Sequence, residues 1–97
     1  MTFEDAVALL RTWTDEQVFV VLEPDGSVMR GPLKEIDSSG IDGALFSVSP
    51  TGVAVALFRD AFAGAELVDG EELRVRQGRV EIIVRRQAGT EAPPPAR

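Results

Sequence analysis

Asp37 and Asp42 are the two residues of this sequence whose types and spacing best suit chemistry, because they flank one short Ser- and Gly-rich loop. Two neighbouring carboxylates can divide the roles of general acid and base, or hold a divalent cation through oxygen ligands. The competing interpretation is that loop aspartates hydrogen-bond their own backbone and only shape the turn. The chain contains no cysteine and no histidine. A histidine base, a thiolate nucleophile and a CxxC zinc site are therefore excluded, and we expect neither an enzyme nor a cofactor.

Arginines near the C-terminus form a second candidate site. Residues 1–73 contain 14 acidic and 4 basic side chains, a net charge of −10, whereas residues 74–97 contain 2 acidic and 6 basic ones, a net charge of +4. Arg74, Arg76 and Arg79 would contact RNA phosphates or another anion if they share a surface. The alternative is the solvated face of a strand pair in an acidic protein. The formal charge of −6 for the whole chain disfavours a protein that coats nucleic acid with its entire surface.

An amphipathic helix over about residues 3–12 is predicted to precede both sites. Apolar side chains recur there at the three- and four-residue spacing of one helical face, at Phe3, Ala6, Val7, Leu10 and Trp13. Thr2 is placed to cap this helix. We expect it to close one open end of a small β-structure, with binding to a partner as the alternative, and Trp13 to anchor its packing rather than to stack on a base.

Six strands are predicted downstream, at residues 18–22, 27–37, 44–49, 53–58, 72–76 and 79–86. Residues 60–70 are rich in alanine and glycine, which indicates a loop or one helical turn. The strand at 53–58 is apolar on both faces, so both faces must be covered, one by the core and the other by the helix or a neighbouring subunit. Val53, Val55, Leu57 and Ile83, which interrupts a charged face, are therefore the candidate oligomer interface.

Gly31 and Pro32 lie in the middle of the second predicted strand. Proline cannot donate a ladder hydrogen bond, and glycine accommodates the sharp bend that closes a short sheet on itself. The predicted fold is mainly β, a small, strongly bent β-barrel of five to six strands with an N-terminal helix. One domain is expected over residues 1–87, followed by a flexible, Pro-rich tail at 88–97.

The second strand also carries a family resemblance. Its residues Val28, Gly31, Leu33 and Asp37 resemble the first signature of the Sm and Sm-like proteins, which belong with the SH3-like small β-barrels. That family has a short N-terminal helix before a strongly bent five-stranded barrel. The resemblance therefore implies this fold, with Gly31, Leu33 and Asp37 as its signature, and it implies RNA binding as a function.

Two positions depart from the family pattern. An asparagine that contacts a base follows the signature aspartate by four positions in the family, and Ile41 stands there in this chain. In the second motif an arginine directly precedes a glycine, whereas Gln77 separates Arg76 from Gly78. The resemblance thus supports the fold and counts against base recognition.

Three hypotheses follow for the function. The first is a non-catalytic β-barrel module that forms a homo-oligomer or binds a protein partner. The second is an Sm-like RNA-binding protein that uses the arginines, and the third is a divalent-metal or hydrolytic site at the two loop aspartates. The longest apolar run, residues 53–58, is far too short for a membrane span and the first residues are acidic. We therefore expect no membrane association and, by default, a cytoplasmic location.

Overall fold

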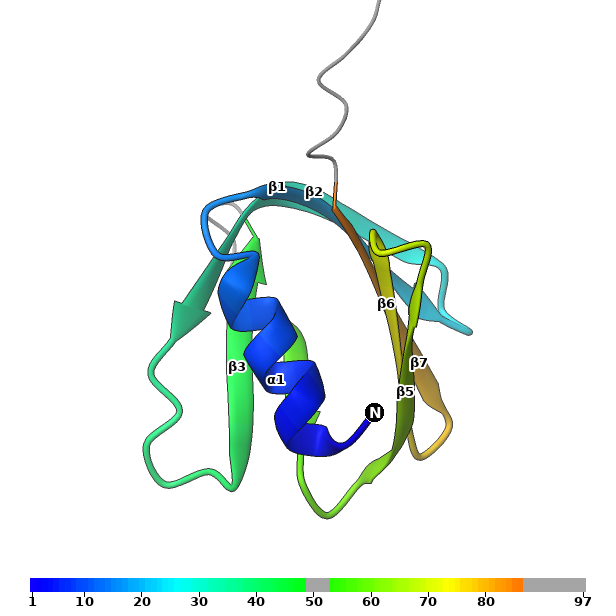
Figure 1. Ribbon diagram of the computed structural model, residues 1–97. Coiled ribbons are helices and arrows are strands. Elements are labelled where there is room, and N and C mark those ends of the chain that lie inside the picture. Colours follow the sequence, from blue (N-terminus) through cyan, green and yellow to red (C-terminus); the bar gives the residue numbers. More distant parts are fainter. Residues whose placement is uncertain (49–52, 87–97) are drawn as a thin grey trace, which may run out of the picture.

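The computed structural model describes residues 1–48 and 53–86, and within them it contains one helix and seven strands (Figure 1). The elements are α1 (Phe3–Thr12), β1 (Gln17–Glu23), β2 (Ser27–Ile36), β3 (Gly43–Val48), β4 (Val53–Phe58), β5 (Phe62–Val68), β6 (Glu72–Gln77) and β7 (Val80–Arg86). All paired strands are antiparallel, in the order β4-β3-β2-β1-β7-β6-β5. The predicted mainly-β class with an N-terminal helix is confirmed. The tail predicted at 88–97 lies outside the described residues.

Helix α1 has the predicted bounds and the predicted cap. The Thr2 hydroxyl accepts a hydrogen bond from the Asp5 N–H at 3.1 Å, and the Asp5 carboxylate accepts one from the Thr2 N–H at 3.0 Å. This capping box satisfies backbone donors that the first helical turn leaves free, and the hydrogen bond from the Thr2 backbone lowers the pKa of Asp5. Trp13 follows the helix and is only 2% exposed, as expected for an anchor. Within the described residues no helix is long and apolar enough to cross a membrane.

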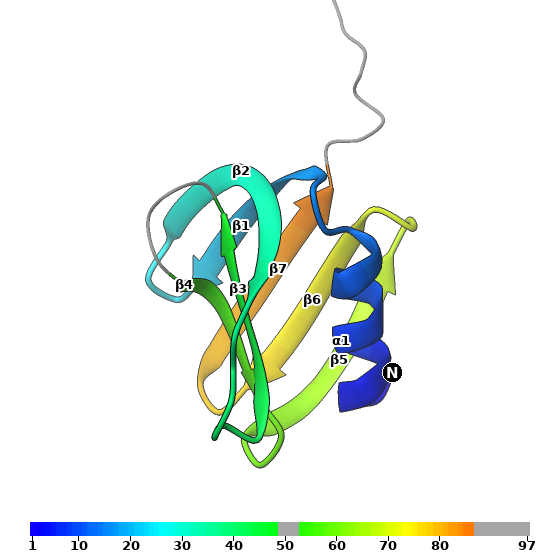
Figure 2. The same ribbon diagram turned by 90° about the vertical axis from the view of Figure 1, so that its left-hand side faces the viewer.

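Strand β2 bends at the predicted place. Its first half pairs with β1 as far as Pro32, and its second half pairs with β3 from Leu33 onward. Gly31 is buried and has a φ of 152°, a value that residues with a side chain rarely adopt. Figure 2 shows the resulting curve of the sheet, with α1 on the side opposite β4. The Gly-Pro pair thus turns one strand from the first sheet segment into the second.

The prediction of a closed barrel of five to six strands is wrong. The sheet has seven strands and stays open, because β4 and β5 are its two edges and do not pair with each other. The missed strand is β5, whose segment was predicted as a loop or a helical turn from its alanine and glycine content. Alanine and glycine have low strand propensity, so this segment is a strand through its pairing with β6 rather than through its composition.

The core lies inside the bent sheet, between two arms. One arm contains β3 and β4, the other β5, β6 and β7, and α1 lies across the opening between them (Figure 1). Phe3 of α1 packs edge-on against Phe62 of β5, with ring centroids 5.8 Å apart. Side chains with at most 1% exposure fill the interior, among them Leu10, Leu33, Phe46, Val55, Leu57, Leu73 and Val84. Helix α1 therefore has the predicted role of closing one opening.

Candidate functional site

The two loop aspartates have structural partners. Asp37 Oδ1 accepts hydrogen bonds from the Ser39 hydroxyl at 2.6 Å and from the Ser39 N–H at 3.0 Å, and these bonds lower the pKa of Asp37. Asp42 Oδ1 accepts a hydrogen bond from Arg59 Nε at 3.0 Å. Among the described residues no group of three or more acidic side chains is placed to hold a metal ion. The geometry thus matches the turn-forming interpretation of these residues.

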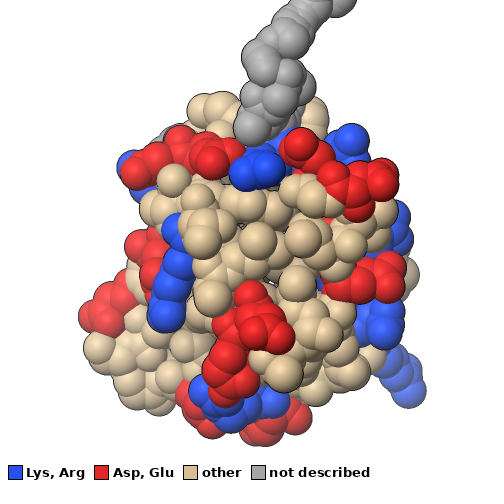
Figure 3. Space-filling view, viewed as in Figure 1, with Lys and Arg blue, Asp and Glu red and all other residues tan. Residues whose placement is uncertain are grey.

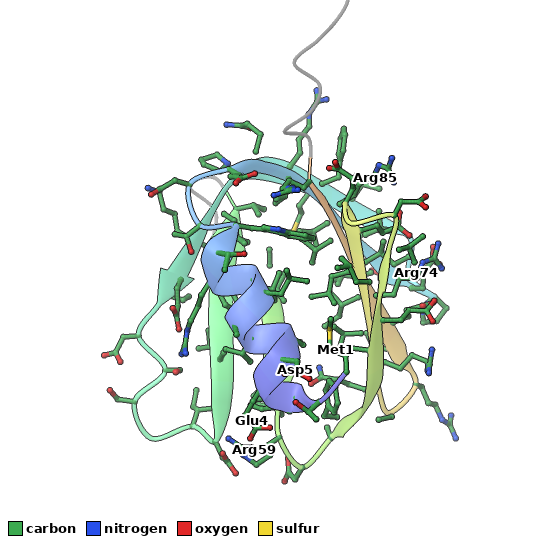
Figure 4. All side chains as sticks on the ribbon, viewed as in Figure 1. Met1, Glu4, Asp5, Arg59, Arg74 and Arg85 are labelled. Carbon is green, nitrogen blue, oxygen red and sulfur yellow. The ribbon has the colours of Figure 1, made fainter. Side chains whose placement is uncertain are left out.

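Arg59 connects this loop to the helix. Its guanidinium pairs with both Asp42 and Glu4 and lies 4.6 Å from the centre of the Phe3 ring. Figure 4 shows Glu4 and Arg59 together beside the first turn of α1. A pocket of about 240 Å³ opens between α1 and β3, and Arg59 and Asp42 both line it. Because these charges already satisfy one another, the pocket offers no free charged group from this cluster.

Of the three arginines in the predicted site, one forms ion pairs within the described residues and two do not. Arg74 Nε lies 2.6 Å from Glu72 Oε2, and Glu72 also pairs with Arg85 at 3.2 Å. Arg76 and Arg79 are exposed, and neither forms an ion pair within residues 1–48 and 53–86. On the face that carries α1, acidic and basic side chains are interspersed (Figure 3). The structure therefore leaves two of the three predicted arginines available to a ligand.

Glu72 gives the cluster a testable pH dependence. The hydrogen bond from Arg74, followed by the charge of Arg74 and the bond from Arg85, lowers the pKa of Glu72. The unfolded chain binds this proton more readily, so the stabilisation is complete above the ordinary carboxyl pKa and is lost as the pH falls through the lowered one. We expect E72Q to be less stable than the wild type at neutral pH and to lose less stability on acidification. Urea unfolding between about pH 7 and about pH 3 measures both effects.

The control for this experiment is D60N, which removes an exposed carboxylate from the turn after β4 that forms no ion pair among the described residues. Its stability is expected to follow the wild-type curve. Parallel curves for E72Q and the wild type would contradict a role for Glu72 in the acid sensitivity of the fold.

Two residues of the candidate oligomer interface on β4 lie in the core of the chain rather than on its surface. Val55 and Leu57 are completely buried in the core of the chain itself, so they are not available to a neighbouring subunit. The side chain of Val53 lies outside the described part. The alternate residues of β4 are Ala54, which is also buried, the partly exposed Ala56 and the exposed Phe58. Ile83 is partly exposed on the outer face of β7, as expected.

The open side of the sheet forms a groove that the sequence did not indicate. It lies between the free edge of β4 and the inner faces of β1, β6 and β7, and its volume is about 420 Å³. We call it the seam. Its lining is almost entirely apolar, formed by Leu22, Ala54, Ala56, Phe58, Ala61, Gln77, Val80 and Ile82. Phe58 and Val80 remain exposed in it, at 38% and 43%.

Gln77 bridges one end of the seam. Its side-chain oxygen accepts a hydrogen bond from the Phe58 N–H at 2.7 Å, and its side-chain nitrogen donates one to the Ala56 carbonyl at 2.8 Å. The amide thereby contacts the edge of β4 as the backbone of a neighbouring strand would. Gln77 is 8% exposed and is the one buried polar residue among the described residues. The sequence did contain a signal for this bridge, because Gln77 follows Leu73 and Val75 at the alternate positions of β6 that point inward.

A second hollow continues from the seam at Val80. It is lined by Glu23, Pro24, Arg76, Gly78, Arg79, Val80 and Glu81. The two arginines without ion pairs thus lie next to the apolar groove rather than on a separate basic surface. Glu81 lies 3.8 Å from Arg74, whereas Glu23 forms no ion pair within the described part of the chain.

No protein-family model, curated protein or solved structure significantly matches this chain.

Proposed function

We propose that this protein is a non-catalytic binding module that takes up an extended segment of a partner protein in the seam. One observation carries the proposal: the free edge of β4 runs along an apolar groove instead of being covered by another strand of the described chain. An unpaired strand edge presents a row of backbone donors and acceptors to whatever lies beside it. The occupant that satisfies such an edge is another extended backbone.

The seam suits strand addition because it combines two kinds of contact. Residues of β4 whose polar groups point away from β3 include Ala56 and Phe58, as the hydrogen bonds to Gln77 show. An added strand would bond to the groups of this edge that Gln77 does not hold, the Ala56 N–H among them, which supplies affinity. Its alternate side chains would reach the apolar floor at Leu22 and Ile82, which supplies specificity. Small side chains at Ala54 and Ala56 leave room for this approach.

Charge favours an acidic residue at one end of that segment. Arg76 and Arg79 lie beside Val80 without an ion pair among the described residues, while Glu81 is engaged by Arg74. Glu23 and Glu81 line the same hollow, and Glu81 is shared with Arg74. An acidic side chain next to the apolar residues of the partner would therefore be attracted to this end of the seam.

The two other hypotheses have less support. Arg74, the first residue of the predicted RNA site, is paired with two glutamates, and the acidic surface as a whole repels phosphates. The metal or hydrolytic site would have to use aspartates that are bound to Ser39 and Arg59. Kinship with the Sm-like and SH3-like barrels remains a prediction for the architecture, with seven strands in place of five.

Selection of peptides from a displayed random library tests the proposal. We expect the wild-type protein to enrich sequences with apolar residues at alternate positions and an acidic residue at one end. The substitution V80E places a carboxylate in the seam and is expected to abolish binding of the selected peptides. The matched control L67E changes a residue of similar exposure, 40% against 43% for Val80, on the distant edge strand β5 and should leave binding intact.

Two results would contradict the seam as a binding site. One is enrichment of no peptide by a folded wild-type protein, and the other is equal binding of the selected peptides by V80E and the wild type. Binding of a single-stranded oligonucleotide that weakens with salt and with R76A would support the RNA hypothesis instead.

A further inference from the structure

The outer face of the sheet carries an apolar row that crosses three strands. Val28 of β2 lies opposite Val21 of β1, which lies opposite Ile83 of β7. Their chain neighbours Val20 and Ile82 are buried, so the three side chains point away from the core. Val28 is 62% exposed, more than any other large apolar residue among those described. The three side chains thus form a continuous apolar row on the outer face, with Val28 its most exposed member.

Charges of opposite sign flank this row. On β7 the outward residues on either side of Ile83 are Glu81 and Arg85. On the neighbouring strand β6 the order is reversed, since Glu72 lies opposite Arg85 and Arg76 lies opposite Glu81. Figure 4 shows Arg85 on the side of this arm that faces away from the interior. Strands β6 and β7 therefore each carry an acidic residue on one side of the line of the apolar row and a basic residue on the other.

We infer that this face binds a second copy of the same chain. A two-fold axis along the apolar row stacks the outer faces of two copies, with each strand antiparallel to its counterpart. Val21 and Ile83 then meet the same residues of the second copy. The inversion along the strands brings Arg85 over Glu81 of the second copy, and Glu72 over Arg76 of the second copy. Symmetry repeats each pair, so the surface is complementary to itself in both apolar and charged positions.

The direction of the axis follows from the charges. An axis parallel to the strands, between β1 and β7, would bring Glu23 against Glu81 of the second copy, because these residues are partners across the two strands. It would also place Val28 against Arg74 of the second copy. The axis along the row avoids both contacts. Its one like-charge contact, Arg74 with its symmetry mate, involves a residue that already has two glutamate partners.

Sedimentation equilibrium over a range of protein concentrations tests this inference on the full chain. The wild type is expected to pass from monomer to dimer as its concentration rises. R85E and E81R each place like charges opposite one another and should weaken the dimer about tenfold or more. The double variant R85E/E81R exchanges the two charges and should restore the dimer. A mixture of R85E with E81R should form a mixed dimer, since both contacts are then attractive.

The apolar row is tested by V28E, with L67E as the control of similar type on β5. V28E is expected to remain a monomer and L67E to dimerise like the wild type, with circular dichroism showing that both are folded. A wild type that stays monomeric at every concentration would overturn the inference, as would a double variant no better than its single variants. The apolar row shares no residue with the lining of the seam, so V28E should still bind the selected peptides and V80E should still dimerise.

Discussion

Replacement of Trp13 by alanine is expected to remove about 3–5 kcal/mol from the free energy of unfolding. Trp13 is 2% exposed and ends the helix, so its indole fixes α1 across the opening of the sheet. The guanidinium of Arg86 lies 5.3 Å from the centre of the indole and close to Glu16 and Glu71, at 3.7 and 3.6 Å. Loss of the ring leaves a cavity and also removes one face of the partly buried site that holds this cation. A small domain has about 5–15 kcal/mol of stability in total, so this loss is a large fraction of it.

Urea unfolding followed by circular dichroism measures this loss. Tryptophan fluorescence is unsuitable, because the variant no longer contains a tryptophan. W13F is the matched control, since it keeps an aromatic ring and should lose less stability than W13A. A loss below about 1 kcal/mol for W13A, the size of an ordinary substitution, would contradict the anchoring role of Trp13.

Replacement of Gln77 by leucine is expected to cost about 2–4 kcal/mol. Leucine fills a similar volume but forms neither bond to β4, so the Phe58 N–H and the Ala56 carbonyl both lose their partners. Each partly buried group left without a hydrogen bond costs roughly 1–3 kcal/mol. Among the described residues, no other hydrogen bond joins β4 to β6.

The matched control is Q17L, which changes an exposed glutamine at the start of β1. Its effect is expected to stay within about 0.5 kcal/mol, as for most surface substitutions. Chemical denaturation gives both values. Equal effects of Q77L and Q17L would show that the side-chain bridge between the two arms does not stabilise the fold.

Much of the fold was predictable because local chemistry sets it. The capping Thr2 and the apolar period give α1 its bounds, and β-branched runs ended by glycine and proline turns give most of the strands. Gly31 and Pro32 correctly marked the bend of β2. The miss was β5, whose alanines and glycine carry no strand signal of their own. Its pairing with β6 comes from tertiary context, which a local pattern does not contain. The same holds for the lack of pairing between β4 and β5, which leaves the sheet open.

The candidate sites were less predictable, for a related reason. Two aspartates on one loop resemble a catalytic pair until Arg59, 17 residues after Asp42, is seen to bind one of them. A strand apolar on both faces indicated covered surfaces at residues 53–58, but not that its outward residues would line a groove. Gln77 became interpretable only once its amide was placed on the edge of another strand. In each case the role of the residue depends on a contact with a residue far away in the chain, which the local sequence does not reveal.

Amide hydrogen exchange, measured residue by residue by NMR with and without a selected peptide, tests the central claim most directly. The Ala56 N–H lies on the free edge of β4, beside the carbonyl that Gln77 binds. If an extended partner segment adds to β4 in the seam, exchange of the Ala56 amide should slow markedly at saturating peptide, while the amides on the free edge of β5 should not change. Protection confined to β5 or to the outer face around Val21 and Ile83, with no change at Ala56, would contradict the claim.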